Sequence, residues 1–486
     1  MPNAPGQGLI AGDYDKAAVA SPEYETEMTV LPTLRDIQTA IMQGKTSAEA
    51  ETSAALGRIE TWNGQLKAFV SVDRERALAE ARHLDHLAKL GVPKGPLHGV
   101  PVAIKDIIHV AGYPTGAGSL TRRGAMPELR DALIVTRLRA AGGVIIGKAA
   151  TVEYAFGGWG SNETMGTPLN PWDMKNPRVP GGSSNGSSVA VAAGLVPGAL
   201  GSDTGGSIRL PSSFSGLVGL KTTAGLIKTI GVLPLSEMLD TLGPLTRTVD
   251  DAAALFAAMC GGQVQDVLRD ETPERLAAWY RGKRIGLVTD LGVELHRDTA
   301  RVYAETRELL ISLGAVIVPI SLGQSLAAYA APCGAFLAVD SYFHYGHFAE
   351  ETPCRLGEPV RRRIMSARDI SAAMHRGNHE RREAEKKAIA GVYEQVDAIL
   401  IPSTAFPAPL MGQHPEHDSP AVFTRFANYL DLAAISLPMG LSGEGLPVGM
   451  QLVVPGFQEG RALRLAKGLE SARGGPILCP LTSQMV

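Results

Sequence analysis

Residues 181–209 are the stretch that most restricts what this chain can fold into. They read GGSSNGSSVAVAAGLVPGALGSDTGGSIR, two glycine-serine loops separated by a short apolar segment. Serines placed between glycines are typical of a catalytic nucleophile or of a loop that cradles phosphate. No histidine lies between His109 and His296. A serine nucleophile in these loops therefore needs a base other than a histidine close in sequence.

The apolar patterns around the loops predict an α/β fold. Val100, Val102 and Ile104 alternate with other residues, which indicates a strand that ends at Lys105. Apolar runs of strand length recur along the chain with helical segments between them, and we expect the last strands to rejoin the first sheet. The expected strands are 144–148, 218–220, 284–292, 315–320, 398–403 and 446–455, and the expected helices include 73–90, 131–142, 187–194, 246–259, 297–313, 357–396 and 459–472.

The length of the chain, 486 residues, is enough for one very large domain or for two to three ordinary ones. We expect an N-terminal arm over residues 1–28 and a single domain over 29–475. That domain is expected to have a helical first part (29–95), a core that carries the serine loops (96–260) and a C-terminal half (282–475). The C-terminal half would complete the sheet and the substrate pocket.

Charge and composition exclude several classes of function. The net charge of −3 gives no reason to expect a nucleic acid or a membrane as partner. The first residues have neither the basic nor the apolar part of a signal peptide, which favours a cytoplasmic protein. The four cysteines are far apart, so neither a disulfide framework nor a zinc site is expected. His375 and His379 have the spacing of metal ligands, but the arginines around them indicate a solvated helix face. We therefore expect no metal and no cofactor.

Two familiar motifs fit the serine loops poorly. A phosphate-binding Walker loop needs glycine directly before its lysine, whereas Leu220 precedes Lys221. Residues 182–186 match the G-x-S-x-G elbow of α/β-hydrolases, with Ser184 as the nucleophile of an esterase. The elbow needs a preceding strand, and residues 177–180 contain two prolines. The elbow remains an alternative at this point.

A third kind of site combines the second loop with a lysine. Gly205 and Gly206 leave backbone N–H groups open and Ser207 follows them, so the segment can hold an oxyanion beside a nucleophile. Lys105 can be the base if burial lowers its pKa, because a lysine with the ordinary pKa of ~10.4 is charged at neutral pH. Alternatively, Lys105 pairs with Asp106 or another carboxylate and has only a structural role.

Several motifs resemble the amidase signature family. They are GVPVAIKD, NPW, VPGGSSNGSS, GSDTGGSIRLPSSFSGLVGLKTT and EGLPVGMQLVVP, which occur in the family's order over nearly the whole chain. The resemblance implies the amidase signature fold, a mixed central β-sheet covered by helices on both faces. It also implies an amidohydrolase that cleaves a small-molecule amide, anilide, carbamate or urea without a cofactor. A homodimer is left open, and the physiological substrate is not identified.

The resemblance also assigns roles to individual residues. Lys105 is the base, Ser183 is a bridging serine in a cis peptide, and Ser207 is the nucleophile. Asp203 and Arg209 are expected to brace the second loop. Asn185 departs from the family pattern, which commonly has glycine there, and can alter the pocket wall. The implied oxyanion donors are Thr204, Gly205, Gly206 and Ser207, and the implied substrate-binding residues are Ala155, Phe156, Gly157 and Ser184.

One alternative within the family is the glutaminase (A) subunit of a tRNA-dependent amidotransferase, which acts with partner proteins. The segments ANYLDLAAISLP and FGGWGSNE differ from the corresponding segments of that protein, which favours a free-standing amidase. Aromatic residues in the C-terminal half favour a hydrophobic or aryl amide as substrate. They are Tyr329, Phe336, Tyr342, Phe343 and Tyr345.

Overall fold

A computed structural model describes residues 31–92, 95–414 and 419–485. The N-terminal arm expected over residues 1–28 lies outside them, and the division into one domain stays a prediction. The helices and strands as far as residue 259 are α1 (Leu34–Met42), α2 (Ala48–Leu66), β1 (Phe69–Val72), α3 (Arg74–Lys89), β2 (Pro101–Lys105), α4 (Leu133–Ala140), β3 (Val144–Ala149), α5 (Asn185–Ala192), β4 (Gly198–Asp203), α6 (Arg209–Ser215), β5 (Val218–Lys221), β6 (Thr241–Thr246) and α7 (Val249–Met259).

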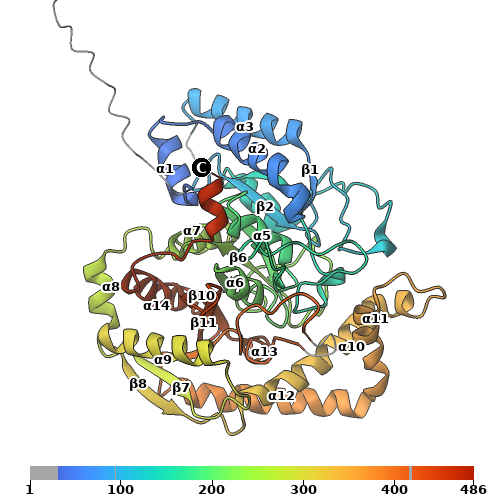
Figure 1. Ribbon diagram of the computed structural model, residues 1–486, viewed down its shortest axis with the longest axis vertical. Helices are drawn as coiled ribbons and strands as arrows, with labels where there is room; N and C mark the ends of the chain where they lie inside the picture. The colour runs from blue at the N-terminus through green and yellow to red at the C-terminus, as the bar shows by residue number, and fades with distance from the viewer. Residues whose placement is uncertain (1–30, 93–94, 415–418, 486) are drawn as a thin grey trace, which may run out of the picture.

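The rest of the described chain extends the same sheet. Its elements are α8 (Pro273–Tyr280), β7 (Arg284–Val288), α9 (Arg297–Ser312), β8 (Val316–Ile320), α10 (Ala330–Ala349), α11 (Glu358–Met365), α12 (Ala372–Tyr393), β9 (Ala398–Pro402), α13 (Arg425–Tyr429), β10 (Ala433–Leu441), β11 (Pro447–Val454) and α14 (Glu459–Ala472). The strands form one sheet of eleven in the order β1-β3-β2-β4-β6-β5-β10-β11-β9-β7-β8. The last strands thus rejoin the first ones, as expected. Figure 1 shows α2 and α3 at one end of the molecule and α12 at the other.

Helices cover both faces of this mixed sheet, and β11 illustrates how. Gly449 faces α6, because a Cβ atom placed on it would lie 2.6 Å from Ser213 Oγ. Gln451 faces the same way and accepts a hydrogen bond from Arg209 of α6. Side chains alternate across a strand, so Met450 points to the opposite face. Both α6 and α14 pack against β10 and β11.

The parallel pair β2 and β4 brings two of the sequence motifs together. The register pairs Val102 with Gly198 and Ile104 with Leu200. Parallel strands end at the same edge of a sheet, so Lys105 at the end of β2 lies beside the loop that follows Asp203 at the end of β4. The α/β topology alone therefore places the lysine next to the second glycine-serine loop.

The structure differs from the sequence expectations in several places, and the short elements β1, β4, β6, α6, α8 and α13 were among those not predicted. The helix expected over 357–396 is two helices, α11 and α12, with a one-turn 3-10 helix (Ser366–Asp369) between them. Helix α10 was not expected, and it starts without a side-chain cap that would have marked it. Strand β10 was not expected either, because it contains Pro438, a residue that disfavours central strands. The pairing of β10 with β11 shifts in register between Pro438 and Gly440.

One helical segment has the length and composition of a membrane span, although no such run was expected from the sequence. It covers Leu326–Ala349, and 44% of its most apolar window is buried inside the protein. Its helix α10 packs against α11 and α13. A buried core helix meets the same criteria of length and hydropathy, so this observation is weak evidence for a span.

Candidate active site

The Lys105 side chain lies at the centre of a buried cluster of hydroxyl groups. Strand β2 is buried at all five positions, so its last side chain enters the interior rather than solvent. Lys105 Nζ lies 2.7 Å from Ser183 Oγ, 3.0 Å from Ser184 Oγ and 2.9 Å from Ser202 Oγ. A neutral amine has two N–H donors and one lone pair, which match three hydroxyl contacts.

Burial lowers the pKa of Lys105 to about 7, against the opposing charges of Asp203 and Asp240, which raise it. The alternative in which Lys105 pairs with Asp106 does not hold. Asp106 pairs instead with Lys148 of the neighbouring strand β3, at 2.7 Å between Nζ and Oδ1. Lys105 is therefore a buried lysine whose neutral form is populated near neutral pH.

The first serine loop supplies Ser183 in the backbone form that the family resemblance implies. The Gly182–Ser183 peptide bond is cis. The Ser183 carbonyl oxygen accepts hydrogen bonds from Val152 N–H and from the Thr151 hydroxyl, at 3.2 and 3.1 Å. These contacts leave the Ser183 hydroxyl directed at the Lys105 amine.

Ser184 is placed as a supporting residue and does not line the substrate cavity. Its side chain is completely buried. Its Oγ contacts Lys105 and the backbone of Ser202, at 3.0 Å and 3.3 Å. Residues 177–182 before it form no strand, so the elbow geometry is absent from this loop. The Ser184 hydroxyl faces the lysine, and its contact with substrate stays a prediction.

The second loop carries Ser207 just before α6. The Ser184 N–H donates to the Ser207 carbonyl oxygen at 3.2 Å, which holds the two serine loops against each other. Ser207 also lines a cavity, whereas Ser183 and Lys105 lie behind it, fully buried. Ser207 is thus joined through the Ser184 backbone to the cluster that contains Lys105 and Ser183, and it lies on the cavity side.

Three of the four expected oxyanion donors are available, and one is not. In the described chain no acceptor is present for the backbone N–H groups of Thr204, Gly205 and Ser207. The N–H of Gly206 instead donates to Asp203 Oδ1 at 2.8 Å. Gly206 has φ +131°, and a Cβ there would lie 2.2 Å from Thr424 Oγ1, so only glycine fits. Its role is to shape the turn while its neighbours point their N–H groups outward.

Asp203 and Arg209 brace this turn, as expected from the sequence. Both side chains are completely buried and lie 3.0 Å apart. Asp203 also accepts hydrogen bonds from the backbone N–H groups of Gly206 and Ile208. The Arg209 guanidinium also donates hydrogen bonds to the side-chain oxygens of Gln451 and Asn428, at 2.9 and 2.6 Å. The Arg209 guanidinium contributes to holding the pKa of Asp203 well below its ordinary value, so the brace stays ionised.

A small cavity opens beside Ser207. Ala155, Phe156 and Gly157 line it, at the positions expected for substrate-binding residues. None of the five aromatic residues expected to form its wall does so, and Phe343 is 82% exposed on the surface. The wall contains leucines and two arginines instead: Leu210, Leu235, Leu337, Arg363 and Arg425.

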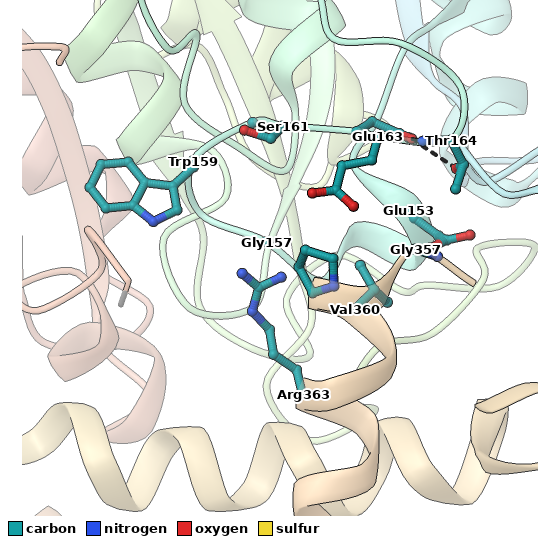
Figure 2. Close-up of a pocket in the computed structure, with 12 residues that line it drawn as sticks. Glu153, Gly157, Trp159, Ser161, Glu163, Thr164, Gly357, Val360 and Arg363 are labelled. Atoms are coloured by element: carbon teal, nitrogen blue, oxygen red, sulfur yellow. Dashed lines mark hydrogen bonds between the residues drawn. The ribbon is translucent and has the colours of Figure 1, made fainter. Parts of the chain in front are cut away.

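A second pocket adjoins this cavity and shares Gly157 and Arg363 with it. Figure 2 shows Arg363 rising from α11 toward Gly157, with Trp159 on one side and Glu163 on the other. Arg363 Nη1 donates to the Phe156 carbonyl oxygen at 2.9 Å. Asn185 is the first residue of α5, and its side chain donates to the Gly160 carbonyl in the wall of this second pocket. It does not line the cavity at Ser207.

Sequence reasoning missed Ser202 and the arginines of the cavity. Ser202 stands directly before Asp203 in β4, and the strand pattern of GALGSD was the signal that could have placed it beside Lys105. Arg363 and Arg425 come from segments with no recognisable motif. Among the residues that the structure describes, no group of three or more histidine, cysteine or acidic side chains has metal-binding geometry. His375 and His379 contact each other on the surface of α12.

The comparisons with known proteins agree on the family. A family model described as Amidase matches residues 50–463. The chain is 34% identical over 480 residues to the A subunit of glutamyl-tRNA(Gln) amidotransferase from Acidobacterium capsulatum, covering 91% of this chain and 98% of that protein. A crystal structure of an amidase has a TM-score of 0.82 at 30% identity, over 90% of this chain and 99% of that one. The crystal structure of the corresponding amidotransferase protein from Thermotoga maritima has a TM-score of 0.71 at 30% identity, over 88% and 92%.

These similarities change the balance between two interpretations of the sequence. Short segments such as ANYLDLAAISLP favoured a free-standing amidase. The similarity to the amidotransferase protein of Acidobacterium capsulatum extends over nine-tenths of the chain, so these short segments do not separate the two interpretations. Both interpretations share the cleavage of a carbon–nitrogen bond.

Proposed function

The chain belongs to the amidase signature family, and on this premise we propose that it hydrolyses a carboxylic amide through a Ser207 acyl-enzyme. The observation that carries the proposal is the 2.7 Å contact between Lys105 Nζ and Ser183 Oγ, directly behind the cavity that Ser207 lines. The neutral lysine supplies the base that no nearby histidine supplies. The alternative esterase with Ser184 as nucleophile receives no support from this geometry.

The proposed first step is acylation. Ser207 Oγ attacks the amide carbonyl carbon while its proton passes to Ser183, whose own proton passes to Lys105 Nζ. The N–H groups of Thr204, Gly205 and Ser207 stabilise the negative charge that develops on the carbonyl oxygen. The charged Lys105 then returns a proton through Ser183 to the leaving nitrogen, and the carbon–nitrogen bond breaks. Water hydrolyses the Ser207 ester by the same relay, which releases the acid and restores the enzyme.

A second candidate is the glutaminase role within an amidotransferase, and the similarity to the amidotransferase protein of Acidobacterium capsulatum supports it. In this role the chain releases ammonia from glutamine mainly when its partner proteins are bound. A tagged chain purified from its native host is then expected to carry partner proteins in stoichiometric amounts. Ammonia release from glutamine should fall at least about tenfold when the partners are removed. Equal turnover by the isolated chain would contradict the amidotransferase role and leave the free-standing amidase.

The proposed relay uses side chains alone, so activity should not depend on a metal ion. Exhaustive chelation followed by gel filtration is expected to leave kcat/KM for a good amide substrate unchanged within about twofold. A chelated sample that loses activity and regains it with added zinc would contradict the relay as written.

A further inference from the structure

Arg425 occupies an unusual position in the cavity that Ser207 lines. It is the first residue of α13 and is partly buried. Its Nη1 donates to the Ala330 carbonyl oxygen at 3.0 Å. Its Nε is buried, and the described part of the chain offers it no hydrogen-bond partner. The side chain thus retains unused donor capacity inside the cavity.

Some buried cations of this protein have a carboxylate partner, whereas Lys221 is held by backbone carbonyl oxygens. Arg209 pairs with Asp203 at 3.0 Å, Arg382 with Asp431 at 2.5 Å, and Lys148 with Asp106 at 2.7 Å. Arg425 forms no ion pair with any residue that the structure describes. Burying a guanidinium without a counter-charge is unfavourable, and burial lowers the pKa of Arg425 below its ordinary value. An anion from outside the chain would supply both the counter-charge and the acceptor that Arg425 Nε lacks.

The anion would lie close to the reacting groups. A Cβ placed on Gly205, one of the oxyanion donors, would lie 3.5 Å from Arg425 Cγ and 3.8 Å from its Nε. Arg363 lines the same cavity, and none of the described residues that line it is an aspartate or glutamate. The described lining therefore places a cationic side chain, Arg425, and no acidic one close to Ser207.

We propose that Arg425 binds a carboxylate on the substrate, so that the substrates are ω-amides of dicarboxylic acids. This inference rests on the proposed amide hydrolysis. A guanidinium presents parallel N–H groups that fit a carboxylate in a bidentate manner, which a lysine cannot reproduce. Glutamine belongs to this class through its α-carboxylate, so the inference applies to both candidate functions. It replaces the hydrophobic or aryl amide expected from the sequence.

The test compares amides that differ only in charge. The substrates are the monoamides of succinic, glutaric and adipic acid, with 5-methylhexanamide as the uncharged counterpart of the glutaric monoamide. Wild-type protein should prefer the best anionic amide. Arg425→Gln should lower kcat/KM for that amide by roughly 100-fold and for 5-methylhexanamide by less than about threefold. Arg425→Lys should recover only part of the loss, because it keeps the charge without the fork.

Controls separate this inference from the proposed function. Arg376→Gln removes the same charge from the exposed surface of α12 and should leave both substrates unaffected. Equal losses for charged and uncharged amides in Arg425→Gln, or no loss, would overturn the inference while amide hydrolysis stands. If wild-type protein, together with any partner proteins that co-purify, cleaves neither these amides nor glutamine, the proposed function loses its support. Calorimetric binding of glutarate then still decides the inference, since Arg425→Gln should abolish it and an unchanged affinity would refute it.

Discussion

Replacement of Lys105 with alanine is expected to lower kcat/KM by about 10⁴-fold, because the relay loses its base. The wild-type pH profile should carry the signature of the same group. The base acts only when it is neutral, so kcat/KM of the free enzyme should rise with pH through about 7 and level off above it. The alanine variant should lose this rising limb together with most of its activity.

Two further variants make the Lys105 result specific. Lys105→Arg should be as inactive as the alanine variant, because a guanidinium stays protonated at any working pH. Lys148→Ala removes an equally buried lysine from the neighbouring strand, where it pairs with Asp106 and does not contact the serines. Lys148→Ala should lower the free energy of unfolding, but the pH profile of kcat/KM should keep its rising limb. A loss below about tenfold in folded Lys105→Ala, checked by circular dichroism, would remove Lys105 from the mechanism.

Ser207→Ala is expected to lower kcat by at least about 10⁴-fold and to abolish labelling by a fluorophosphonate probe, since the atom that forms the acyl bond is removed. Ser184→Ala tests the rival nucleophile. Its hydroxyl is buried against Lys105 and Ser202, so the variant should still be labelled, although more slowly because the lysine loses one of its three contacts. Mass spectrometry of the labelled peptide identifies the modified serine. If the probe labels Ser207→Ala fully and does not label Ser184→Ala, the nucleophile is Ser184 and the elbow mechanism is supported.

Lys105 and Ser207 could be proposed from local rules, whereas Ser183 was assigned only by the resemblance to the amidase signature family. A strand of alternating apolar residues places its last side chain at the edge of the sheet, and this located Lys105. The consecutive glycines before Ser207 predicted backbone N–H groups without an acceptor. Of the three such N–H groups in the structure, two belong to Gly205 and Ser207. The sequence could not show that the Gly206 N–H is unavailable to an oxyanion. Its hydrogen bond to Asp203 forms only because of the path that the turn takes.

The substrate cavity could not be predicted, since its residues come from distant parts of the chain. Leu337 lies in α10, Arg363 in α11 and Arg425 in α13, and each reaches the cavity through tertiary packing. The aromatic residues of α10 suggested a pocket wall from composition alone. In the structure Phe336 packs on His375 and His379, and Tyr345 packs on Tyr154. Composition indicates that apolar side chains will be buried, and the topology decides whether they are buried in the core or line a cavity.

The contacts that hold Arg209 in place have a consequence for folding during synthesis on the ribosome. Arg209 is held by Asn428 and Gln451, more than two hundred residues further along the chain. Asn428 also donates to the carboxylate of Asp203. The turn that carries Ser207 is thus fully supported only when strand β11 has emerged from the exit tunnel. A nascent chain contains Lys105, Ser183 and Ser207 long before Asn428 and Gln451 are made, so we expect it to be inactive during most of its synthesis.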